Sequence, residues 1–167
     1  KADEAFLPNG INRWTPKRYW KKLNNIAREI ISLGEGDDGT AAIPDLVGLC
    51  EVENDSVITH LIRRTRLAAL GYEYAMTDCR DVRGIDVALL YQPYTFRLIE
   101  KESCSVLYNA EKERPTRDIL RCSGVVPTGD TLDVMVVHFP SRRGGASLTD
   151  AYRCRAAEVV CRVADSL

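Results

Sequence analysis

The segment VVHFPSRRGG, residues 136–145, gathers groups that could bind an anion. His138 closes an apolar run, and Ser141, Arg142, Arg143 and two glycines follow it directly. Guanidinium and hydroxyl groups are strong donors to phosphate oxygens, and glycines let a loop approach a ligand closely. The pattern predicts a phosphate site at this strand end. The alternative is a histidine whose ring is hydrogen-bonded within the core.

Two further groups of charged residues stand at the ends of apolar runs. Glu51 and Glu53 close the run LVGLCEVEN, and residues two apart on an extended chain face the same side. Arg80, Arg83 and Asp86 stand where the apolar run DVALLY begins. Taken singly, a solvated strand end or a polar sheet edge explains each of these groups.

Helical and extended patterns alternate along the chain. Thr15 as N-cap and Pro16 at the first helical position open a helix predicted over 16–33. Further helices are expected over 55–70, with Asp55 or Ser56 as cap, and over 149–166. The strand candidates, bounded by turn residues, are PDLVGLCEVEN, YEYAMTDC, IDVALLYQP, FRLIEKESCSVLY, TRDILRCSGVV and LDVMVVHF.

This order of elements predicts an α/β (α+β) fold with a mixed, largely antiparallel sheet and helices on one face. We expect the segments DLVGLCE, DVALLY and LDVMVVHF to share that sheet. Their residues are apolar on both alternating sets, so the second face of the sheet must also be covered. A second sheet of this chain, a part absent from it, or a partner could provide the cover.

Composition fits one globular domain over residues 1–167. The formal net charge of −1 argues against a protein that coats nucleic acid non-specifically, although it leaves a local basic patch open. No apolar stretch is long enough to span a bilayer. The six cysteines form no CxxC pair, which argues against a zinc ribbon and favours buried thiols over disulfides.

The ordered motifs PDLVGLCEVEN, RGIDVALLY and LDVMVVHFPSRRGG resemble the endonuclease/exonuclease/phosphatase superfamily, which includes deoxyribonuclease I, sphingomyelinases and inositol-phosphate phosphatases. With WTPKRYWKKL before the glutamate, the chain is similar to predicted nucleases of Bacteroidetes-like bacteria. The resemblance implies part of a four-layer αββα sandwich. It also implies hydrolysis of a phosphate ester with a divalent cation, Mg²⁺ or Mn²⁺.

The resemblance also implies roles for individual residues. Glu51 matches the metal-binding glutamate of the family, although Cys50 stands where the family usually has glutamine. His138 matches the histidine that contacts the scissile phosphate. Arg83 is the nearest candidate for a basic residue on the phosphate, and Ser141 with Arg142 would bind neighbouring oxygens. One carboxylate alone gives too few ligands for tight magnesium binding.

Other family motifs do not occur in this sequence. The family's first strand with its asparagine, its GDFND strand and its final DH are all missing. We therefore expect an incomplete domain, a fragment with little hydrolytic activity of its own. The alternative function is a non-catalytic module that binds a partner or self-associates through an exposed sheet face. The substrate stays open among nucleic acid, lipid headgroups and inositol phosphates. No signal peptide is visible, so a secreted or periplasmic location would require its earlier removal.

Overall fold

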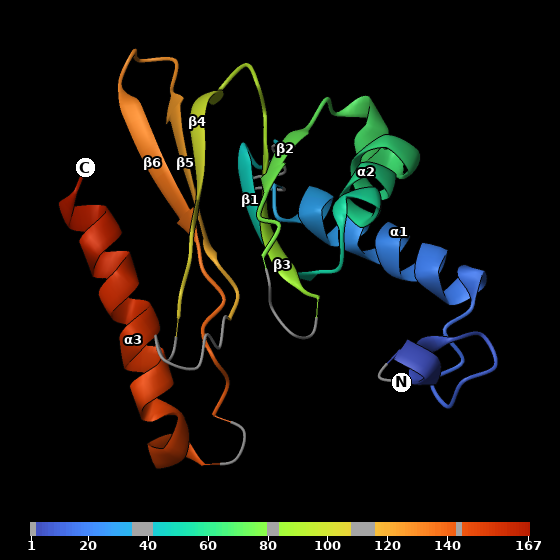
Figure 1. The fold of residues 1–167 in the computed structure, drawn as a ribbon. Coiled ribbons are helices and arrows are strands. Elements are labelled where there is room, and N and C mark those ends of the chain that lie inside the picture. Colours follow the sequence, from blue (N-terminus) through green and yellow to red (C-terminus); the bar gives the residue numbers. More distant parts are fainter. Residues whose placement is uncertain (1–2, 35–41, 80–83, 108–115, 143–144) are drawn as a thin grey trace. The chain divides into compact units, whose positions relative to one another are not determined.

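The structure, a computed structural model, describes residues 3–34, 42–79, 84–107, 116–142 and 145–167. Arg80, Arg83 and Arg143 lie outside the described residues. The chain divides into two compact units, which we describe separately: unit 1 comprises Lys1–Pro44 and Thr59–Gly71, and unit 2 comprises Asp45–Ile58 and Tyr72–Leu167. The helices and strands are α1 (Pro16–Ser32), β1 (Leu46–Val52), α2 (Asp55–Arg64), β2 (Glu73–Met76), β3 (Asp86–Tyr91), β4 (Arg97–Cys104), β5 (Ile119–Val125), β6 (Thr131–Val136) and α3 (Ala146–Asp165) (Figure 1).

Helix α1 of unit 1 begins as its sequence predicts. The Thr15 hydroxyl accepts a hydrogen bond from the Arg18 amide at 3.4 Å, and Pro16 occupies the first helical turn. Leu23, Ala27 and Ile30 form the buried side of the helix. Spacings of three and four residues place these side chains on one face, so burying them orients the whole helix.

The predicted helix over 55–70 is shorter than expected. It ends at Arg64, and the Thr65 hydroxyl accepts from the Leu67 amide at 3.2 Å to start a separate 3₁₀ turn, Arg66–Ala69. The cap prediction was also wrong. Asn54 caps the helix, because its side-chain oxygen accepts from the Val57 amide at 3.2 Å.

The strands of unit 2 form two sheets of three, with the orders β1-β3-β2 and β4-β5-β6. All four described strand pairings are antiparallel. The prediction that LDVMVVHF shares a sheet with DLVGLCE and DVALLY was therefore wrong. Apolar residues on both faces of a strand cannot distinguish one large sheet from two stacked ones, because both arrangements bury both faces.

The two sheets pack face to face through a common apolar core. Ala75, Val87 and Leu89 of the first sheet share this core with Leu120, Cys122 and Val136 of the second sheet and with Phe96, which directly precedes β4. The absence of a side chain at Gly124 makes room for the Phe96 ring, since a Cβ there would lie 2.5 Å from it. We expected the second face of the sheet to be covered, and a second sheet of the same chain covers it.

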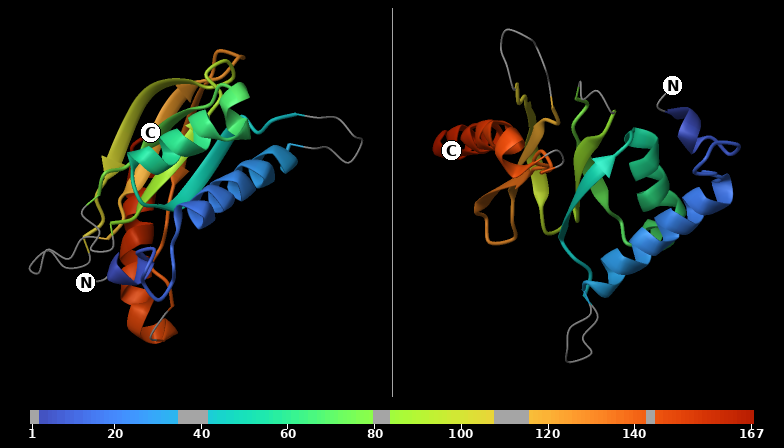
Figure 2. Two further views of the ribbon diagram at one scale, coloured as in Figure 1. Left: turned by 90° about the vertical axis from the view of Figure 1, so that its right-hand side faces the viewer. Right: turned by 90° about the horizontal axis from the view of Figure 1, so that it is seen from below.

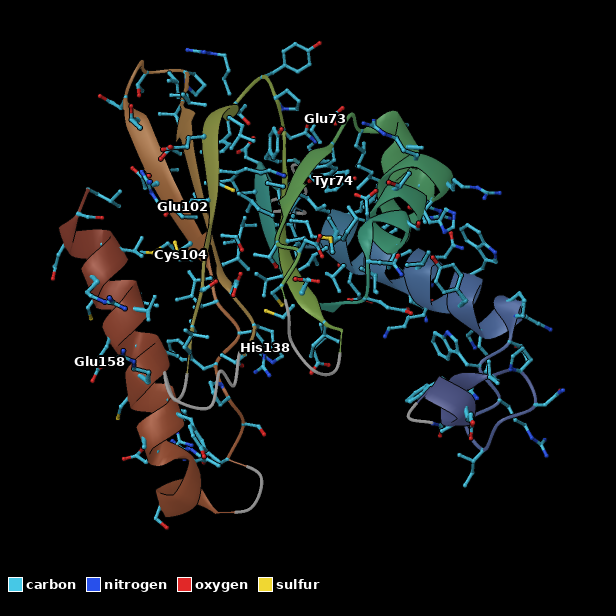
Figure 3. All side chains as sticks on the ribbon, in the orientation of Figure 1. Glu73, Tyr74, Glu102, Cys104, His138 and Glu158 are labelled. Carbon is cyan, nitrogen blue, oxygen red and sulfur yellow. The ribbon has the colours of Figure 1, made fainter. Side chains whose placement is uncertain are left out.

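The other face of the second sheet packs against α3 (Figures 1 and 2). Cys104, Val106 and Ile119 meet the helix residues Ala156 and Val159 there. Figure 3 shows Cys104 on the side of the sheet that faces α3. This α/β arrangement of stacked antiparallel sheets with a helix outside them confirms the predicted fold class.

All six cysteines lie in the described part of the chain, and no disulfide joins them there. Cys104 and Cys122 are buried, as predicted, but Cys50, Cys154 and Cys161 are exposed. Burial raises the pKa of the Cys122 thiol to about 11, so this side chain behaves as a neutral apolar group. Among the described residues, no helix is apolar and long enough to cross a bilayer.

Candidate functional site

Glu51 lies at an irregularity in β1. Cys50 pairs with Val87 and Val52 pairs with Asp86, so Glu51 is an extra residue that opposes no partner. Its backbone has a positive φ of 60° and its side chain is 64% exposed. A left-handed conformation costs a residue with a Cβ about 1–2 kcal/mol. Such strained bulges often aim a side chain at a functional site.

His138 lies two residues beyond the end of β6, and its side chain is 25% exposed. Figure 3 shows it past the strand end, on the side of the other sheet. Arg117, only 8% exposed, donates from Nη2 to the carbonyl oxygens of His138 at 3.0 Å and Phe139 at 3.1 Å. One buried guanidinium therefore fixes the backbone that carries the imidazole.

The structure brings Glu51 and His138 together from different sheets. The Oε1 atom of Glu51 lies 3.9 Å from Nε2 of His138. The residues that precede them are also joined, because the Cys50 thiol donates to the carbonyl oxygen of Val137 at 3.7 Å. The glutamate and the histidine thus form a carboxylate–imidazole pair where the ends of β1 and β6 meet.

The electrostatics of this pair act on the neighbouring thiol. Partial burial is the main cause that raises the pKa of Cys50, although the residue as a whole is exposed. The negative charge of Glu51 raises this pKa further, and the positive charge of Arg117 lowers it. The glutamate, the thiol and the arginine therefore share one local field, which also acts on any anion bound there.

Of the other residues predicted for the site, Ser141 and Arg142 are exposed in the segment that follows His138. Arg83 lies outside the described residues. Glu53 lines a separate cavity of about 580 Å³ with Asp55, Asp78, Asp86 and Lys101. The charged residues of this lining are four acids against one lysine and would repel a phosphate, so the cavity does not extend the predicted anion site.

Asp86 has a structural explanation rather than a catalytic one. It is buried, and one of its oxygens accepts from the Thr77 hydroxyl at 2.7 Å and from the Cys79 amide at 2.9 Å. These bonds join the end of β2 to the start of β3. Asp86 is therefore a buried structural residue of the central strand β3, and the polar edge that we considered for Arg80 and Arg83 is not tested, because both arginines lie outside the described residues.

The described residues only partly fit the divalent cation that the family implies. An exposed carboxylate such as Glu51 is a suitable ligand for a hard cation. However, no group of three His, Cys, Asp or Glu side chains that could hold a metal occurs in the described part of the chain. Glu51 could supply one ligand, and we assign no reaction step to the metal.

Arg117 is the site residue that sequence reasoning missed. It stands in the segment TRDIL, which was interpreted only as a strand candidate. Two buried charged residues in a row, Arg117 and Asp118, directly precede β5. The sequence shows only a charged pair before an apolar run; the burial of the pair, which implies dedicated partners, is visible only in the structure.

A family model described as "Endonuclease/Exonuclease/phosphatase family" matches residues 1–167. The chain belongs to this family. Its members are phosphoric ester hydrolases, and they generally use divalent metal ions. No curated protein matches the sequence.

Solved structures share the fold at low sequence identity. An endonuclease/exonuclease/phosphatase from Bacteroides vulgatus is 15% identical with a TM-score of 0.62, over 86% of this chain and 51% of that one. The human Nocturnin catalytic domain is 18% identical with a TM-score of 0.61, over 87% and 52%. D. rerio TDP2, complexed with a single-strand DNA product, is 19% identical with a TM-score of 0.56, over 84% and 48%. The present chain spans about half the length of these structures.

Proposed function

We propose that this chain carries part of the active site of a metal-dependent phosphodiesterase or phosphatase. The observation that carries the proposal is the distance of 3.9 Å between Glu51 and His138, in a chain of a phosphoric ester hydrolase family. An imidazole beside a carboxylate suits a site where a cation and a phosphate oxygen meet. Members of the family that resemble this chain include TDP2, whose structure holds a single-strand DNA product, so nucleic acid is a candidate substrate.

In this proposal each residue has one role. Glu51 supplies one carboxylate ligand to Mg²⁺ or Mn²⁺, an ion that stabilises negative charge on a phosphate when it is bound. His138 donates from its ring to a phosphate oxygen. Ser141 and Arg142 donate to neighbouring oxygens, and Arg83 is a further candidate for that contact.

The same proposal expects hydrolysis near background from these 167 residues alone. No group of three potential metal ligands occurs among the described residues, and the GDFND and DH motifs of the family do not occur in the sequence. General acid–base assistance is worth about a hundredfold to ten-thousandfold in rate. An assay with a phosphodiester substrate and Mg²⁺ or Mn²⁺ tests this expectation. Robust turnover that disappears in Glu51→Ala would show that the site is more complete than we propose.

Binding can be tested without turnover, because the chain has only two histidines, His60 and His138. Mn²⁺ is paramagnetic and broadens the proton resonances of nearby groups. We expect low concentrations of Mn²⁺ to broaden the imidazole signals of His138 well before those of His60. Glu51→Ala should remove this selectivity.

Two results would contradict the assigned metal position. Equal broadening of both histidines would indicate no site at Glu51, and unchanged broadening of His138 in Glu51→Ala would indicate other ligands. Mg²⁺ added in excess should compete with Mn²⁺ and restore the His138 signal. Glu53→Ala is the matched control, because it removes an exposed carboxylate two residues away that lines the separate cavity.

A further inference from the structure

Charge is divided unevenly between the two units. Unit 1 contains ten Lys and Arg residues against six Asp and Glu, whereas unit 2 contains thirteen against eighteen. The net charge of −1 therefore combines a basic unit with an acidic one. The near-neutral total argued against non-specific binding to nucleic acid, but it does not describe unit 1.

The positive charge of unit 1 is concentrated on the exposed side of α1. We call this side the basic face, and it consists of Lys17, Arg18, Lys21, Lys22 and Arg28, all of them exposed. Spacings of four and eleven residues align three of them in one row along the helix. Glu29 is the one acidic residue in α1, every residue of which the structure describes.

Two indole rings border the basic face. The Nζ atom of Lys22 lies 5.7 Å from the centre of the Trp14 ring. The guanidinium of Arg64 lies 4.9 Å from the centre of the Trp20 ring, and the centres of the Trp20 and His60 rings are 5.1 Å apart. Alternating cations and aromatic rings are typical of surfaces that bind single-stranded nucleic acid, where cations meet phosphates and rings meet bases.

We propose that the basic face of α1, together with Trp14 and Trp20, binds the backbone of single-stranded nucleic acid. This inference rests on the proposed function, since it names nucleic acid as the phosphate ester. It also assigns a role to the basic unit 1. The acidic residues of unit 2 would repel a polyanion, and the cations of unit 1 would attract it. Contacts to phosphates carry no base sequence, so the binding should not depend on sequence.

A membrane surface fits the same region less well. Helices that bind a bilayer insert an apolar face among the acyl chains. The apolar face of α1 is not available for this, because Leu23, Ala27 and Ile30 are at most 4% exposed. Only the cations could meet a lipid headgroup.

The test measures binding of a fluorescein-labelled, mixed-sequence DNA oligonucleotide of about 20 nucleotides, a length that exceeds the usual site size. EDTA is present throughout, so that metal-dependent hydrolysis does not contribute. Fluorescence anisotropy reports the affinity. Both tryptophans of the chain, Trp14 and Trp20, lie in unit 1, so their own fluorescence should change on binding.

A pair of matched double variants locates the surface. Lys21→Gln with Arg28→Gln removes two charges from the basic face, and Arg97→Gln with Arg162→Gln removes two exposed charges from unit 2. We expect the first variant to bind about tenfold more weakly and its salt dependence, the slope of log K on log salt, to fall by about 1.4. The second variant should bind like the wild type. Circular dichroism verifies that both remain folded.

Three outcomes would overturn the inference: no binding by the wild type at low salt, equal losses in both double variants, or stronger association with phosphatidylserine vesicles than with DNA. Glu51→Ala separates this inference from the proposed function. Oligonucleotide binding in EDTA should be unchanged in that variant. If selective Mn²⁺ broadening fails while oligonucleotide binding follows the basic face, only the proposed metal position fails.

Discussion

The two units place their cations differently. Unit 1 keeps Lys17, Lys21 and Arg28 exposed on one side of a helix, where they retain their hydration and remain accessible to a ligand. Unit 2 buries Arg117, whose guanidinium donates to the carbonyl oxygens of His138 and Phe139. Exposed cations contribute little to stability, whereas a buried cation must be compensated by hydrogen bonds. The exposed cations of unit 1 are therefore suited to attract an anionic ligand, and the buried Arg117 of unit 2 is suited to position His138.

The residues that report on each unit are also separate. Both tryptophans lie in unit 1, all six cysteines lie in unit 2, and each unit contains one histidine. Tryptophan fluorescence, thiol chemistry and histidine NMR signals can therefore follow one unit at a time.

The largest effect is expected from Phe96→Ala in the core between the two sheets. Phe96 is 1% exposed, and replacing such a ring by a methyl group costs about 3–5 kcal/mol in the free energy of unfolding. Urea unfolding followed by circular dichroism measures the loss. Tryptophan fluorescence, measured in the same samples, should show whether unit 1 unfolds at the same urea concentration.

Tyr94→Ala is the matched control for that substitution. Tyr94 lies two residues before Phe96 and is 95% exposed, so we expect a change within about 0.5 kcal/mol. A loss for Phe96→Ala as small as the loss for Tyr94→Ala would contradict the stacked-sheet core.

An intermediate effect is expected from Arg117→Met. Two backbone carbonyls would lose a charged donor, which costs about 1–3 kcal/mol. The imidazole signals of His138 should shift, because its backbone is no longer held, while those of His60 in unit 1 should not. Arg117→Lys keeps the charge but not the planar guanidinium, so its effect should be smaller. Equal shifts of both histidines, or of neither, would argue against a positioning role for Arg117.

Much of the helical part of the fold follows from local sequence. Thr15 and Pro16 determine where α1 begins, and the spacing of Leu23 and Ile30 determines which side it buries. The division into two sheets could not be predicted in this way. Strand pairing depends on contacts between residues far apart in the chain, and the apolar residues of β3 and β6 fit either arrangement.

The candidate site could also be predicted only in part from the sequence. The motifs indicated Glu51 and His138, since each closes an apolar run. They did not indicate the bulge that gives Glu51 its positive φ, because an extra residue in a strand is defined only by its partner strand. The role of Arg117 was hidden for a similar reason, as its partners lie 21 and 22 residues further along the chain.

The smallest expected effect concerns the Cys50 thiol, whose pKa depends on the charges around the site. Its pKa is raised by partial burial and by the charge of Glu51, so the thiol is neutral near pH 7 and reacts slowly with alkylating reagents. Glu51→Gln removes the negative charge and should lower this pKa, so alkylation should begin at a lower pH. Arg117→Met removes the positive charge that lowers the pKa and should act in the opposite direction.

Alkylation of Cys50 as a function of pH, followed by peptide mass spectrometry, measures both changes. Cys154, exposed on α3, is the internal reference and should react alike in all three proteins. The sign of the shift is decisive. If both substitutions move the midpoint for Cys50 in the same direction, a general loosening of the strand end explains the result better than charge. Opposite shifts would indicate that Glu51 and Arg117 act on one point in unit 2, where the proposed phosphate site lies.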